Sequence, residues 1–149
     1  MLKSFDVPLL WLGLVLCLGT GHFGVQQTAP WLIPLLKTLV PWAPARDLQA
    51  LHIVLRKLVH LTEYAILGRV WLVGVLTWRA PTVRTASWIA LLVCVACAFL
   101  DELHQSMLLH RTGSVSDALL DCLGALMMLL MLRFRYEAST SDPAIATAR

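Results

Sequence analysis

An uncharged run, residues 86–100, ends at two adjacent carboxylates, Asp101 and Glu102. Apolar runs approaching about 20 residues are typical of helices that cross a membrane. Ionisable side chains beside hydrocarbon are costly, and they usually turn toward polar partners inside a bundle of helices. The run therefore indicates a membrane helix, and the two carboxylates predict that basic or polar partners lie elsewhere in the chain.

The composition favours a membrane protein. The chain has 149 residues, of which 58% are hydrophobic and 14% are charged, whereas soluble domains carry about 25% charged residues. The length fits a single domain. The net charge of +3 is small, and the basic residues are not interleaved with aromatic ones. We therefore expect no nucleic-acid partner.

All four cysteines lie in apolar runs. They are Cys17, Cys94, Cys97 and Cys122. Thiolates are disfavoured in hydrocarbon, so the C-x-x-C spacing at Cys94 and Cys97 predicts small packing residues, without a redox or metal-binding role.

The hydropathy pattern predicts four membrane spans. They cover about residues 7–25, 58–78, 83–103 and 115–132. Lys3 precedes the first span as in a signal peptide, but no small-residue cleavage site follows, so we expect an uncleaved helix. The short connection over residues 79–84 predicts that the second and third spans form a tight helical hairpin.

Residues 26–56 separate the first two spans. Four prolines are expected to cut this stretch into short pieces: Pro30, Pro34, Pro41 and Pro44. Trp31 and Trp42 are typical of the headgroup boundary and predict an interfacial helix. Asp47 is expected to cap a second short helix that leads into the next span.

Two segments flank the last span. Residues 106–114 are short and begin with apolar residues, which favours a short re-entrant or interfacial turn. Ser114 and Asp117 fit a capping box at the start of the fourth span. Residues 137–149 are small and polar and predict a disordered tail, so the domain covers residues 1–136. The predicted fold is an all-α membrane protein, a bundle of four transmembrane helices with the interfacial helix and this turn.

Polar residues form a stripe on each of the last three spans, all at one membrane depth. The stripes are Lys57, His60, Glu63 and Tyr64, then Asp101, His104 and Gln105, then Asp117 and Asp121. Taken alone, Lys57 can snorkel to the interface and Asp117 can be a helix cap. Asp121 fits neither explanation, because it lies one turn inside an apolar span. We expect the stripes to face one another and form a shared site.

Two chemistries suit this set of residues. The carboxylates with His60 and His104 can hold a hard divalent cation. Lys57, Arg111 and His60 can instead hold a phosphate, with bidentate contacts from Arg111. Both occur together in metal-assisted phosphoryl chemistry. The sequence has no nucleophilic Ser or Cys elbow. It also has no Gly-rich phosphate loop, so no nucleotide cofactor is expected.

At these residues the chain resembles the VanZ-like family of small bacterial membrane proteins. The matching motifs are Lys57-x-x-His60-x-x-x-Tyr64-x-x-Leu67-Gly68, Asp101-Glu102-x-x-Gln105 followed by Arg111, and Asp117-x-x-x-Asp121-x-x-Gly124. Family members often have Pro-Gly before the arginine and Asn in place of Asp121. The resemblance covers residues 50–132 well. It implies a role at the cell envelope and a link to resistance to the glycopeptide teicoplanin.

The resemblance and the basic residues together predict the location. The side that holds both termini carries Lys3, Arg79, Arg84, Arg133 and Arg135, and the other side carries Lys37, Arg46, Arg56, Lys57 and Arg111. The counts tie, but the first set lies compactly beside span ends, and positive residues there favour the cytoplasmic side. We therefore expect a multi-pass protein of the bacterial cytoplasmic (inner) membrane, with cytoplasmic termini and a polar site that faces outward.

Three functions follow from these features. The first is a binding protein for an anionic, phosphate-bearing lipid or cell-wall lipid intermediate, and its contacting residues would be Lys57, Tyr64, His104, Gln105, Arg111 and Asp121. The second is an intramembrane hydrolase or phosphotransferase acting on lipid headgroups by metal or acid/base catalysis, through His60, Asp101, Glu102 and Asp117. The third is a purely structural bundle, against which the intramembrane charges argue. The oligomeric state stays open.

Overall fold

The protein is helical throughout the described residues. The computed structural model describes residues 2–20, 24–79, 81–107 and 113–141. In chain order its elements are η1 (Leu2–Ser4), α1 (Asp6–Leu18), α2 (Val25–Leu39), α3 (Ala45–Arg79), α4 (Val83–Ser106) and α5 (Val115–Ser141). The predicted all-α class is confirmed. Helices α3, α4 and α5 are each long and apolar enough to cross a membrane, and α1 is apolar but shorter.

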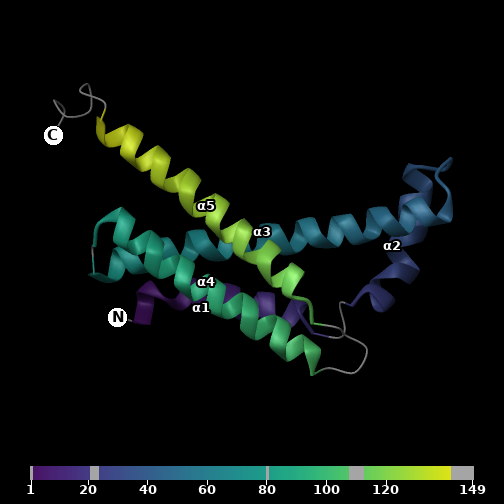
Figure 1. Ribbon diagram of the computed structural model, residues 1–149, viewed down its shortest axis with the longest axis horizontal. Helices are drawn as coiled ribbons and strands as arrows, with labels where there is room; N and C mark the ends of the chain where they lie inside the picture. Colours follow the sequence, from purple (N-terminus) through teal and green to yellow (C-terminus); the bar gives the residue numbers. More distant parts are fainter. Residues whose placement is uncertain (1, 21–23, 80, 108–112, 142–149) are drawn as a thin grey trace.

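Helix α3 is the centre of the bundle. It packs against α5, α4, α1 and α2, and α4 also packs directly on α5 (Figure 1). Small residues recur every fourth position on α4, and all are fully buried: Ala86, Ala90, Cys94 and Ala98. Such a stripe lets helix backbones approach closely in an apolar environment. Tyr64 and Leu67 of α3 fill the space beside it, in one core cluster with Val15 of α1.

The N-terminal third of α3 differs from the prediction. A separate short helix after Asp47 was expected, but α3 continues unbroken for 35 residues, about 52 Å. The reason is local, because neither Gly nor Pro occurs between Ala45 and Leu67. This length exceeds the hydrocarbon thickness of about 30 Å. Residues 45–56 therefore extend beyond the bundle and pack against α2 (Figure 1), and we call residues 25–56 the arm.

Helix α2 also differs from the prediction. Pro30 and Pro34 were expected to break it, but both lie inside one helix of 15 residues. They are one turn apart, so Pro34 lacks the N–H that would bond to the carbonyl of Pro30, and the disruption falls on one side of the helix. Packing against α3 stabilises the other side of α2. The Thr28 hydroxyl lies 3.0 Å from Nε2 of His52, which is buried on α3.

The first predicted span is shorter than expected. Helix α1 ends at Leu18 and has 13 residues, about 20 Å, so the prediction of one helix over residues 7–25 is wrong. It lies antiparallel to α3. Phe5 packs on Trp71 and Trp78, and the Trp11 indole donates a hydrogen bond of 3.0 Å to the Glu63 carbonyl. Helix α1 therefore completes a four-helix packing, although it is too short to be assigned as a span by length.

The connection from α4 to α5 is described only at its ends. The predicted re-entrant turn and Arg111 fall largely in residues 108–112, outside the described residues. Gly113 lies against the Glu102 carbonyl, with no space for a Cβ. The predicted capping box does not form, because the Ser114 hydroxyl pairs with that of Ser116 at 2.6 Å and the Asp117 carboxylate accepts from Lys57.

Helix α5 continues beyond its predicted end. The fourth span was expected to stop near residue 132 and the tail to begin at residue 137, but α5 ends at Ser141. An ion pair spans one turn here, with 2.7 Å between Arg133 Nε and Glu137 Oε1. Such i, i+4 pairs favour helix, so the first residues of the predicted disordered tail are helical.

Candidate functional site

The predicted polar stripes of α3 and α5 meet at one end of the bundle. Lys57 and His60 of α3 face Asp117 and Asp121 of α5, and each pair is one turn from the next. The approach is close because Gly124 lies directly against the Leu61 backbone, with 3.2 Å between a Cβ built at position 124 and Leu61 Cα. The absence of a side chain at Gly124 therefore brings the two stripes together.

The outer pair of the site is exposed. Lys57 Nζ donates to Asp117 Oδ1 at 2.7 Å, and the two side chains are 47% and 40% exposed. Exposed ion pairs contribute about 0–1 kcal/mol, so this contact adds little stability. It holds a cation at the rim of the site, where an anionic ligand can compete with Asp117.

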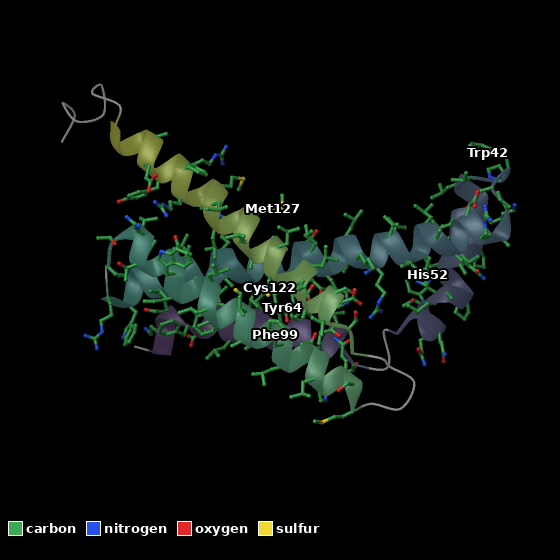
Figure 2. All side chains as sticks on the ribbon, in the orientation of Figure 1. Trp42, His52, Tyr64, Phe99, Cys122 and Met127 are labelled. Carbon is green, nitrogen blue, oxygen red and sulfur yellow. The ribbon has the colours of Figure 1, made fainter. Side chains whose placement is uncertain are left out.

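The inner pair is buried. His60 Nδ1 lies 3.7 Å from Asp121 Oδ1, which is within ion-pair range but too long for a hydrogen bond. Asp121 is fully buried, and neither of its oxygens has a hydrogen-bond partner among the described residues. The Tyr64 hydroxyl is buried in the same way, in the middle of the bundle near Cys122 (Figure 2). Buried polar groups of this kind are costly and require an explanation.

The two carboxylates of α4 connect helix ends. Asp101 Oδ2 accepts a hydrogen bond of 2.8 Å from Gln105 Nε2, and Glu102 Oε2 accepts one of 2.7 Å from the Ser114 backbone N–H. Asp101 also lies against Gly19 just beyond α1, where a Cβ would be 2.7 Å from Oδ1. These contacts place Asp101 beside the end of α1 and Glu102 beside the start of α5, with Gln105 bonded to Asp101 one turn along α4.

His104 is not brought into the group. His104 is exposed, whereas Asp101 and Gln105, four residues apart on α4, are both buried. The structure thus unites Lys57, His60, Tyr64, Asp117 and Asp121, places Asp101, Glu102 and Gln105 beside them, and leaves His104 on the outer face of α4.

A cavity of about 280 Å³ adjoins this cluster on the side of the arm. It lies between the end of α1, α2 and α3, and its polar lining residues are Thr28, His52, Arg56, His60 and Glu63. His60 therefore lies between the cavity and Asp121. The remaining lining is apolar.

Sequence reasoning missed Arg56 and His52 as part of the site. The signal was present, because His52, Arg56 and His60 are each four residues apart and so share one face of a helix. The expected break in the arm hid this spacing. His52 lies well out along α3, away from Tyr64 (Figure 2).

The alternative of a metal centre has little geometric support. Among the described residues, no group of three or more His, Cys, Asp or Glu side chains is placed to hold a metal ion. The carboxylates point instead to separate partners: Asp117 to Lys57, Asp101 to Gln105, and Glu102 to Ser114.

Three helices long and apolar enough to cross a membrane, with Asp101, Glu102 and Asp121 buried among them, have the features of a helical membrane protein. A family model described as VanZ/LLP1 matches residues 8–136. The chain therefore belongs to the VanZ/LLP1 family, as its three motifs predicted. Searches of curated proteins and of solved structures gave no match.

Proposed function

We propose that this VanZ-like envelope protein binds an anionic, phosphate-bearing lipid, with the phosphate in the cavity at the base of the arm. The observation that carries the proposal is the pairing of Arg56 and His60 on one wall of an otherwise largely apolar cavity. A planar guanidinium binds phosphate oxygens in a bidentate manner, and an imidazole N–H adds a further donor. Lys57 follows Arg56 directly on α3 and is paired with Asp117 on the side of α5, so it adds positive charge near the cavity without lining it.

The nearby carboxylates do not oppose this arrangement. Asp101, Glu102 and Asp121 lie behind His60, toward α4 and α5, and Asp117 is held by Lys57. Among the described residues, Glu63 is the one carboxylate that lines the cavity, one turn deeper than His60. Arg56 and His60 therefore line the cavity itself, while Asp117 and Asp121 lie beside Lys57 and His60 on the side of α5.

The proposal includes a location in the bacterial cytoplasmic membrane. Helix α1 would cross as the fourth span, and the N-terminus and the end of α5 lie at the same end of the bundle, away from the arm (Figure 1). Arg79, Arg84 and Arg133 belong to that end. The positive-inside rule then places both termini in the cytoplasm and the site outside. The arm would lie at the outer surface.

The orientation predicts a labelling pattern. In a background with all four cysteines replaced by alanine, Met107→Cys should react with an impermeant maleimide in intact cells, because Met107 is 73% exposed at the site end of α4. Thr85→Cys, exposed at the other end of α4, should react only after permeabilisation. The reverse pattern would overturn the orientation, and labelling of both from one side would show that α4 does not cross.

The phosphate site predicts a loss of binding on removal of Arg56. Arg56→Ala should weaken binding of dioleoyl phosphatidic acid to the detergent-solubilised protein by about 10- to 100-fold, since a hydrogen bond to a charged group contributes about 1.5–3 kcal/mol. Binding of uncharged dioleoylglycerol should not change. Native mass spectrometry or thermophoresis measures both.

Arg46→Ala is the matched control. Arg46 is on the same helix, its side chain is 92% exposed, and it lies 3.6 Å from Asp47, so its removal should leave binding unchanged. Equal losses from both variants would indicate non-specific attraction of the lipid to basic residues. Since the family resemblance implies a link to teicoplanin resistance, a host that produces the wild type should tolerate more teicoplanin than one that produces Arg56→Ala. Release of free phosphate from the lipid would instead indicate an enzyme.

A further inference from the structure

A second cavity continues from the first, deeper along α3. It has a volume of about 560 Å³ and lies between α1, α2 and α3. The two cavities have five lining residues in common: Leu18, Leu32, Leu55, Val59 and Glu63. They therefore form one continuous cleft, which we call the α1–α3 cleft.

The chemistry of the α1–α3 cleft changes from one end to the other. At the arm end it carries Arg56 and His60. Farther in, the walls are formed by Trp11, Leu14 and Val15 of α1 and by apolar residues of α3. The polar side chains of this deeper lining are Thr62, Glu63 and the indole of Trp11. A cationic entrance followed by an apolar channel complements a molecule with an anionic head and an apolar tail.

The length of the cleft matches one leaflet of a bilayer. Its wall on α3 runs from Leu55 to Ile66, which is about 16 Å at 1.5 Å per residue. Half of a hydrocarbon core of about 30 Å is about 15 Å. A chain that enters beside Arg56 would therefore end near the membrane midplane, where α3 packs on the interior of the bundle.

We propose that the α1–α3 cleft holds one alkyl chain of the phosphate-bearing lipid. The inference rests on the proposed function for the identity of the headgroup. Glu63 lies where the two cavities meet, and its backbone carbonyl is held by the Trp11 indole at 3.0 Å. Glu63 therefore lies beside the position at which the headgroup of the lipid would join the chain.

The test fills the deeper part of the cleft and leaves the cationic entrance unchanged. Leu14 of α1 lines only the deeper cavity and is 44% exposed, while Leu9 on the same helix is 52% exposed and lines neither cavity. Leu14→Trp should weaken binding of dioleoyl phosphatidic acid by at least about tenfold, because several methylene groups lose their apolar contacts. Leu9→Trp should bind like the wild type, and the binding of short-chain dihexanoyl phosphatidic acid should be equal in all three proteins.

The outcomes separate the chain site from the phosphate site. Wild-type affinity of Leu14→Trp for the long-chain lipid would overturn the chain site, even if Arg56→Ala still weakens binding. Loss of binding in Leu14→Trp for both phosphatidic acid and dioleoylglycerol, with no effect of Arg56→Ala, would support the chain site and reject the phosphate site. A phosphatidic acid with a diazirine in its chain gives a second measurement on the unsubstituted protein. Cross-links to Leu14 or Thr62 support the proposal, and cross-links confined to α4 and α5 contradict it.

Discussion

Gly124→Ala should lower the melting temperature of the solubilised protein by about 5 °C. A Cβ at position 124 would meet the Leu61 carbonyl and lie 3.0 Å from Leu61 C and 3.2 Å from its Cα. These atoms belong to the backbone of a buried part of α3, so they cannot move away as a flexible side chain can. Overpacking of this kind costs about 1–3 kcal/mol, and a domain of this size loses about 2–4 °C per kcal/mol.

Gly13→Ala is the matched control. Gly13 also lies inside a helix, but a Cβ built there has no atom within 4 Å. Alanine favours helix over glycine by about 0.5–1 kcal/mol, so this variant should melt at the same temperature or slightly higher. Equal melting temperatures for the two variants would show that α5 does not depend on close contact with α3.

The consequence of Gly124→Ala reaches the site. Gly124 lies one turn beyond Asp121 on α5, and the same close approach sets the 3.7 Å between Asp121 and His60. A separation of α5 from α3 would therefore lengthen both pairs between the helices and weaken lipid binding together with stability. The third family motif, Asp117-x-x-x-Asp121-x-x-Gly124, thus combines two side chains of the site with the residue that brings them to α3.

The sequence predicted the elements that depend on local pattern. The uncharged run over residues 86–100 became α4, and its small residues at every fourth position became the buried face. The i, i+4 spacing of Asp117 and Asp121, and the shared face of Lys57 and His60, predicted two stripes that face one another, because helix geometry fixes which residues share a face; which residues pair across the helices was not predicted. These features needed no knowledge of the tertiary structure beyond helical spans.

The arm could not be predicted in the same way. Pro30 and Pro34 are helix breakers by propensity, and packing of α2 on α3 overrode that tendency. Because a break was expected before the second span, Arg56 was counted only as a basic residue of the outer side, and its alignment with His60 was not predicted. The cavity also depends on where α1 ends, at Leu18, and that boundary is set by tertiary contacts such as Gly19 beside Asp101.

Asp121→Asn should keep or raise the melting temperature, yet weaken binding of dioleoyl phosphatidic acid by about tenfold. The buried carboxylate has His60 at 3.7 Å and no hydrogen-bond partner among the described residues. A buried polar group without one costs about 1–3 kcal/mol, and an amide costs less to bury than a charged carboxylate. Stability alone would therefore favour replacement of Asp121. Its carboxylate lies 3.7 Å from Nδ1 of His60, so the proposed phosphate site predicts that its negative charge supports His60 as a donor to an anionic ligand through the other ring nitrogen.

Asp117→Asn is the informative comparison, because it removes the same charge one turn earlier on α5 with the opposite expected result. Asp117 holds Lys57 in an exposed pair of 2.7 Å, which contributes about 0–1 kcal/mol, so the melting temperature should change little. Release of Lys57 should tighten binding of the anionic lipid, since the cation no longer has a competing partner. Tighter binding in Asp117→Asn and weaker binding in Asp121→Asn would show that the two pairs differ: Asp117 competes with the lipid for Lys57, and Asp121 supports His60 as a phosphate ligand. A parallel change in both variants would mean that only the total charge of the site matters, and the assignment of His60 as a phosphate ligand would then be wrong.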